Sequence, residues 1–168
     1  MPERPAGADR FALPEFTRAL RGFASVGSLG SPDHDGVFAP LLAARKAAAR
    51  VATVEGRLAA FDAARLRRGL DESIEAMCAA RTPRAGADRR ALHARLTELA
   101  EPALQALDRM ERSAADLRAA TDAERAERWP TWIRSVQALF DGTDRFWIAV
   151  QASLPPARGR RGSRAGET

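Results

Sequence analysis

The most restrictive feature of this sequence is a run of mainly apolar residues near its C-terminal end that alternates spacings of four and three. Its members are Trp129, Ile133, Val136, Phe140, Thr143, Trp147, Val150 and Leu154. Such spacings place side chains on one side of an α-helix, whereas a half-buried strand would need strict alternation. The pattern predicts an amphipathic helix from Pro130 to about Leu154, ended by the pair Pro155 and Pro156.

The remaining composition also favours helices. The chain has 168 residues and no Tyr, and long stretches consist mostly of Ala, Arg, Leu and Glu, which form helices more readily than strands. A chain of this length fits one domain. We therefore expect an all-α, up-down bundle of about four helices over residues 11–154, between a flexible N-terminus (1–10) and a disordered Arg-rich tail (155–168).

The first half of the bundle is expected to contain a short helix and a long one. Apolar residues spaced by three and four predict the short helix over 13–23, and the stretch 25–36 is rich in Gly, Ser and Asp and predicts a loop. The long second helix is expected from Val37 to about Ala80. Its apolar seam shifts by one step near Leu66, so either the helix bends or a stutter rotates the seam; Gly69 is the candidate weak point, because glycine weakens a helix interior by about 1 kcal/mol relative to alanine.

The second half begins after a polar interruption at 81–88. A third helix is expected from Asp88. Pro102 clashes with the carbonyl four residues earlier, so a kink is expected near Glu98, but no termination, since the apolar spacing continues across the proline. Thr121 and Glu124 match a capping box, which predicts a new helical turn there. Because proline disfavours helical geometry in the preceding residue, a bend is expected at Trp129 before the last helix.

All three tryptophans of the chain lie in this last region, and they allow two interpretations. The first is core packing, because a helix that contacts several partners needs a regular apolar seam. The second is a protein-binding surface, because aromatic side chains that a narrow bundle leaves uncovered serve as interface anchors. The candidate partner-binding residues, on the seam and its flank, are Trp132, Phe146, Leu139 and Trp129.

The net charge of +5 raises a second hypothesis, nucleic-acid binding. Four Arg and one Glu in residues 155–168 account for +3 of this charge, which leaves only +2 for the rest of the chain. Two Arg-rich runs, 65–68 and 81–90, lie at the expected end of helix two and start of helix three, where they could join into one patch. The candidate phosphate-binding residues are Arg65, Arg67, Arg68, Arg81, Arg84, Arg89, Arg90, Arg158, Arg160 and Arg161.

Catalytic chemistry has little support in the sequence. The chain has one cysteine, Cys78, and two histidines, His34 and His93, and no Glu-x-x-His pair or Walker-type glycine loop. We therefore expect no catalytic residues, no metal site and no cofactor. A single cysteine, no apolar leader and no apolar stretch of membrane-spanning length favour a cytoplasmic protein.

These observations predict a non-catalytic protein–protein interaction module, an adaptor, scaffold or small helical subunit of a larger assembly, with a protein partner or a second copy of itself. The alternative is a nucleic-acid backbone-binding subunit of a nucleoprotein effector complex. A coat protein that opens amphipathic helices onto an apolar granule surface is a third alternative.

Overall fold

The computed structural model describes residues 32–51, 53–82 and 86–154, and every regular element within them is an α-helix. The expected helix at 13–23 and both terminal segments lie outside the described residues. The all-α prediction is confirmed. The helices are α2 (Pro32–Ala49), α3 (Val54–Ala60), α4 (Ala63–Arg81), α5 (Ala87–Ala119) and α6 (Asp122–Ser153).

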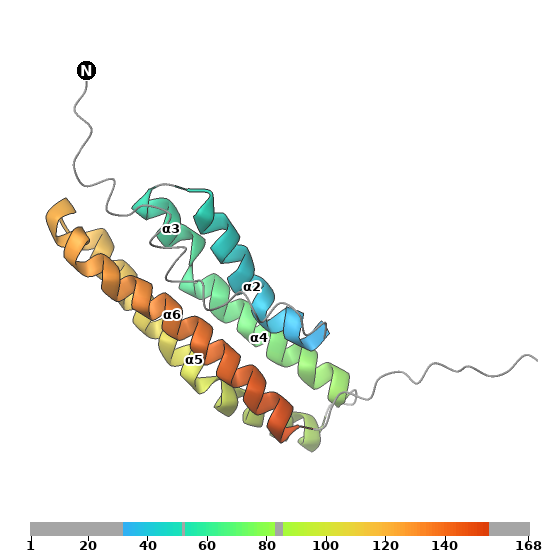
Figure 1. The fold of residues 1–168 in the computed structure, drawn as a ribbon. Helices are drawn as coiled ribbons and strands as arrows, with labels where there is room; N and C mark the ends of the chain where they lie inside the picture. The colour runs from blue at the N-terminus through green and yellow to red at the C-terminus, as the bar shows by residue number, and fades with distance from the viewer. Residues whose placement is uncertain (1–31, 52, 83–85, 155–168) are drawn as a thin grey trace, which may run out of the picture.

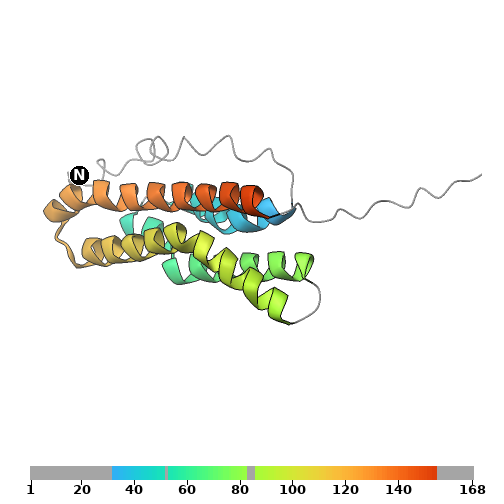
Figure 2. The same ribbon diagram turned by 90° about the horizontal axis from the view of Figure 1, so that it is seen from below.

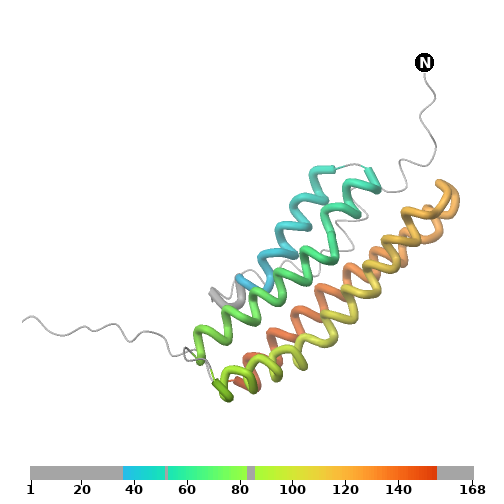
Figure 3. Tube along the Cα trace, turned by 180° about the vertical axis from the view of Figure 1, so that it is seen from behind, coloured from blue at the N-terminus to red at the C-terminus, as the bar shows by residue number. Residues whose placement is uncertain are grey.

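The four long helices form two antiparallel pairs. Figure 1 shows α2 beside α4 on one side of the bundle and α5 beside α6 on the other. Seen from below, α2 lies next to α6 and α4 next to α5, so each long helix occupies one corner (Figure 2). The view from behind shows the chain reversing between α2 and α4 and again between α5 and α6 (Figure 3). The expected up-down bundle is therefore present.

The second helical region does not bend at Gly69 but reverses direction between Ala49 and Val54. Thr53 begins α3 as its N-cap, with its hydroxyl oxygen accepting from the Gly56 N–H at 3.1 Å. Asp62 then separates α3 from α4, its carboxylate accepting from the Arg65 N–H at 2.7 Å. These caps satisfy the first N–H groups of each helix and so permit the breaks. We refer to α2, α3 and α4 together as the helical hairpin.

Gly69 instead marks the closest contact between α2 and α4. A Cβ atom at this position would lie 2.6 Å from Cγ of Pro40, so only glycine fits against the proline ring. Pro40 lies inside α2 and cannot donate to the Gly36 carbonyl as a helical residue would. The buried Ser73 hydroxyl of α4 lies 2.8 Å from that oxygen and 2.8 Å from the Gly69 carbonyl of its own helix, so its single proton is shared between the two acceptors and partly replaces the missing backbone donor.

The start of α2 also differs from expectation, because residues 32–36 are helical and not part of a loop. Pro32 occupies the first helical position, where its fixed φ is compatible with a helix and its missing N–H has no helical acceptor.

The third helix is confirmed as α5, with Pro102 on its exposed side, and its first part is inclined to the remainder (Figure 2). Just beyond the proline α5 approaches α6 most closely. A Cβ on Gly142 would lie 3.0 Å from both Cα and N of Ala103. Further along the same interface, the buried hydroxyls of Ser113 and Ser135 are hydrogen-bonded at 3.0 Å.

The capping box at Thr121 and Glu124 is confirmed, but the expected bend at Trp129 is wrong, because α6 runs unbroken from Asp122 to Ser153. Pro130 is exposed, so its ring meets solvent and not a packed neighbour. Trp129 and Trp132, by contrast, are buried. Keeping both rings in the core favours a continuous helix over a break, even though one helical hydrogen bond is lost.

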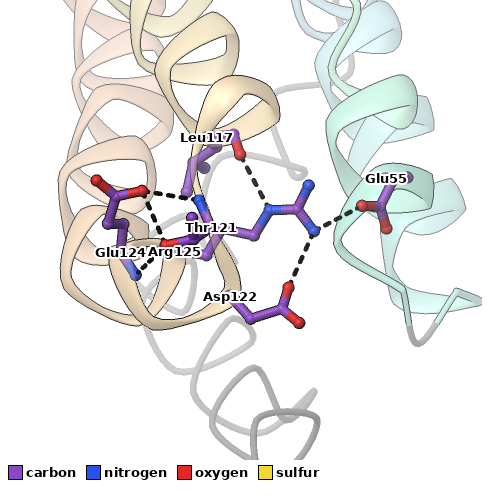
Figure 4. A network of polar contacts seen from close by, with 6 residues as sticks. All are labelled: Glu55, Leu117, Thr121, Asp122, Glu124 and Arg125. Carbon is purple, nitrogen blue, oxygen red and sulfur yellow. Dashed lines mark hydrogen bonds and ion pairs between the residues drawn. The ribbon is translucent and has the colours of Figure 1, made fainter.

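Polar contacts fasten α3 to the turn between α5 and α6 (Figure 4). The Arg125 guanidinium contacts Glu55 of α3 at 3.0 Å and Asp122 at 3.6 Å, and its Nε donates to the Leu117 carbonyl at 3.1 Å. Thr121 and Glu124 close the capping box beside it. One arginine therefore joins the last turn of α5, the first turn of α6 and the helical hairpin.

Candidate functional site

The four residues predicted as partner anchors belong to the protein's own core. The exposed fractions of Trp129, Trp132, Leu139 and Phe146 are 5%, 0%, 2% and 0%. The rings of Trp129 and Trp132 are stacked with centroids 5.0 Å apart, and Phe61 meets Trp132 edge-on at 5.8 Å. The exposure that the partner-anchor interpretation required is absent, and core packing accounts for the aromatic seam.

The same core contains a cation that the sequence interpretation missed. Arg57 of α3 is 1% exposed, its Nε donates to the Val51 carbonyl at 3.3 Å, and its guanidinium lies 5.9 Å from the ring centroid of Trp129. Burial lowers the pKa of Arg57 from its ordinary value. Its place under the α2–α3 turn makes Arg57 a structural residue and not part of an accessible site.

The predicted arginine patch does not form as one surface. Arg68 and Arg81 are thirteen residues apart on the continuous helix α4, which corresponds to about 20 Å at 1.5 Å per residue. Arg67 forms an ion pair with Asp108 of α5, and Arg89 forms one with Glu75 at 3.1 Å. Arg81 is half-buried and Arg90 is exposed. The other candidates, Arg84, Arg158, Arg160 and Arg161, lie outside the described residues.

Two of the predicted arginines, Arg65 and Arg68, do share a surface. They are three residues apart on the exposed side of α4, a spacing that brings side chains together on a helix. They line a hollow between α2 and α4 with Ala39, Pro40, Gly69 and Glu72. Small residues form the floor of this hollow because the two helices cross closely at Pro40 and Gly69.

Two further cations on α2 extend this surface, and the sequence interpretation missed both. Ala39, Ala43, Lys46 and Arg50 are exposed at spacings of four, three and four, so they follow one side of α2 and the turn after it. Ala39 lines the hollow beside the arginines of α4. We define the hairpin face by these exposed and hollow-lining residues: Ala39, Ala43, Lys46, Arg50, Arg65, Arg68, Gly69 and Glu72.

The positive charge of the hairpin face is not neutralised within the described part of the chain. Lys46, Arg50, Arg65 and Arg68 form no ion pair there; Glu72 is the one carboxylate of the face, and the Asp62 carboxylate, which accepts from the Arg65 N–H, borders it. Residues 86–154, which form α5 and α6, carry ten Arg against eleven Asp and Glu. Residues 32–82 carry eight Arg and Lys against seven Asp and Glu, so both pairs of helices are almost neutral overall, and the hairpin face is a local concentration of positive charge.

The antiparallel pairing of α2 and α4 fixes the size of the charged cluster. Because Pro40 packs on Gly69 and Gly36 bonds to Ser73, Arg68 lies at the level of residue 41 and Arg65 at the level of residue 44. Levels 41–50 span about 14 Å along the helix axis at 1.5 Å per residue. Four cations within this length form a compact site for a polyanion.

The groups best suited to nucleophilic or metal chemistry have other surroundings. Cys78 is 0% exposed, and burial together with the neighbouring Glu75 raises the pKa of its thiol, which favours the unreactive protonated form. His93 contacts Glu75 at 3.2 Å, the same carboxylate that Arg89 holds. Within the described residues no three His, Cys, Asp or Glu side chains gather closely enough to hold a metal ion.

No helix in the described ranges has the length and apolar character needed to cross a membrane. No protein-family model matches the sequence, and no curated protein or solved structure shows significant similarity to it.

Proposed function

We propose that this protein is a non-catalytic binding module, an adaptor or small helical subunit of a larger cytoplasmic assembly, which holds an acidic partner on its hairpin face. The observation that carries the proposal is the cluster of Lys46, Arg50, Arg65 and Arg68, four cations without ion-pair partners in the described chain. Cations held close together attract an acidic surface and release their counterions when it binds.

The location of the cluster supports this proposal over simple solvation of surface charges. Some arginines elsewhere on the described surface have carboxylate partners, as in the pairs Arg95 with Glu98 and Arg128 with Glu124, whereas others, such as Arg90, Arg109 and Arg145, form no ion pair. The hairpin face differs in that four unpaired cations lie within about 14 Å along the helix axis, although Glu72 is one helical turn from Arg68. The apolar side chains lie inside the bundle, and Ile148 of α6 is the one large apolar residue that is well exposed in the described ranges. Charge is therefore the main means of recognition on this face.

The test is size-exclusion chromatography with light scattering on protein purified from its own cells, at low and high salt. We expect a complex at low salt that is lost at high salt and in the variant Arg65→Gln/Arg68→Gln. The matched control is Arg109→Gln/Arg112→Gln, which removes the same charge from exposed residues of α5. A complex that both variants retain, or a wild-type protein that is monomeric and alone at low salt, would refute the proposal.

A further inference from the structure

We infer that the acidic partner is a nucleic-acid duplex, contacted along its phosphodiester backbone by Lys46, Arg50, Arg65 and Arg68 of the hairpin face. This inference rests on the function proposed above and specifies the chemistry of the partner. It uses only two of the arginines that the sequence suggested and adds two cations that the chain reversal brings to the same surface.

The composition of the hairpin face favours phosphates over an acidic protein. Protein interfaces usually have an apolar or aromatic centre surrounded by a polar rim. Apart from its cations and Glu72, the hairpin face has only small residues, Ala39, Ala43 and Gly69, and Pro40 completes the hollow between them. Protein–nucleic acid interfaces are more polar and more positively charged, and most of their hydrogen bonds go to phosphate and sugar.

The absence of exposed rings on this face favours a duplex over a single strand. Single-strand binders combine a basic groove with aromatic side chains on which bases stack. The described part of α2 and α4 has one aromatic residue, Phe38, and it is buried. Backbone contacts without base contacts carry no sequence information, so recognition should be independent of sequence.

The hollow at the centre of the face suits such contacts. Arg65 and Arg68 stand beside a floor formed by Pro40 and Gly69, where α2 and α4 are closest. A low floor lets an anion come near both guanidinium groups without a large side chain in its way. Guanidinium groups recognise phosphate oxygens through two parallel N–H donors, which gives these arginines a stronger contact than lysine would provide.

The number of cations sets the expected salt dependence. Each neutralised phosphate contributes about −0.9 to the slope of log K against log salt for duplex DNA, so four contacts give about −3.6. Removal of Arg65 and Arg68 should make the slope shallower by about 1.8. A fourfold increase in salt would then weaken wild-type binding about 12-fold more than it weakens binding of the double variant. This difference is independent of any contribution from the Arg-rich segment 155–168.

The experiment is fluorescence anisotropy of a labelled 20-base-pair DNA duplex titrated with the full chain between 50 and 200 mM salt. Three proteins are compared: wild type, Arg65→Gln/Arg68→Gln and the control Arg109→Gln/Arg112→Gln. We expect the slope of the face variant to fall by about 1.8 and that of the control to remain within about 0.5 of wild type. Circular dichroism confirms that each variant is folded, since all four substituted residues lie outside the buried core.

Other outcomes separate this inference from the proposed function. If the slope of log K against log salt became equally shallower in both double variants, binding would depend on overall charge, and the hairpin face would not be the binding site. Tighter binding of single-stranded dT20 than of the duplex would indicate base stacking and also overturn the inference. Binding of polyglutamate through the same two arginines without duplex binding would overturn the nucleic-acid assignment but leave the acidic-partner proposal standing. Failure of both probes would overturn both.

Discussion

The close crossing of α5 and α6 at Gly142 gives a quantitative test of the fold. In Gly142→Ala, the new Cβ would lie 3.0 Å from Cα and N of Ala103 and 3.2 Å from the carbonyl carbon of Pro102. These are backbone atoms, so relief requires α5 and α6 to move apart. Overpacking of this kind costs about 1–3 kcal/mol, and the better helix propensity of alanine recovers about 1 kcal/mol. We expect a net loss of up to about 2 kcal/mol in the free energy of unfolding, and no gain.

The assay is urea denaturation followed by circular dichroism, with linear extrapolation to water. The matched control is Gly36→Ala in α2, where the new Cβ meets only Oγ of Ser73 at an ordinary 3.9 Å. That substitution should stabilise the protein by about 0.5–1 kcal/mol through helix propensity alone. If Gly142→Ala gained as much stability as Gly36→Ala, the α5–α6 crossing would not be as close as described.

Three further predictions concern the helical hairpin and the start of α6. Ser73→Ala should cost about 0.5–1.5 kcal/mol, because it removes the hydroxyl that the carbonyls of Gly36 and Gly69 share. In a Pro40→Ala background, where residue 40 supplies its own N–H, the same substitution should cost less than half as much, which a double-mutant cycle measures. Gly69→Ala should weaken duplex binding at unchanged net charge, because a Cβ 2.6 Å from the Pro40 ring would widen the hollow; unchanged anisotropy titrations would contradict this. The pKa of Glu124 is lowered below its ordinary 4.5, because its carboxylate accepts from the backbone N–H and the hydroxyl of Thr121. The positive charge of Arg128 lowers it further. The ionised Glu124 therefore stabilises the fold above pH 4.5, and this stabilisation is lost as the pH falls through the lower pKa of the folded state. Glu124→Gln should lack this loss, which denaturation measured at a series of acidic pH values would show.

The helices that carry a long regular seam could be predicted from the sequence, because burial dominates their energetics. The spacing from Trp129 to Val150 identified the buried side of α6 correctly, and the capping box located its first turn. The single error in this region came from Pro130. A local rule predicted a bend there, but the burial of Trp129 and Trp132 on the opposite side outweighs one lost hydrogen bond.

The chain reversal after Ala49 could not be predicted in the same way. Leu41 and Ala48 on one side of it and Leu58 and Phe61 on the other all face one core, so the apolar spacing continues almost unchanged across the turn. The apolar periodicity alone therefore cannot distinguish two antiparallel helices from one continuous helix. The local signals were the caps Thr53 and Asp62, whose side chains are short polar groups that occur at many other positions.

Gly69 illustrates a different limit of sequence interpretation. As an isolated letter it indicates a weak point in a helix, and the expected bend was assigned to it on that basis. In the structure it is the position that lets Pro40 of α2 pack against α4. Its packing partner, Pro40, is twenty-nine residues away along the chain, so the need for glycine can be recognised only once the two helices are known to be paired.

The candidate site depends on that same pairing, which explains why half of it was missed. In one extended helix, Lys46 and Arg50 would lie far from Arg65 and Arg68, whereas the reversal returns α4 alongside α2 and brings the four cations to one surface. The crossing at Pro40 and Gly69 then sets the distance between the two rows of charge. The α5–α6 pair holds the helical hairpin from behind through Arg67 with Asp108 and Glu55 with Arg125. A polyanion on the hairpin face therefore meets cations on a backbone already fixed by packing, and only their side chains must become ordered on binding.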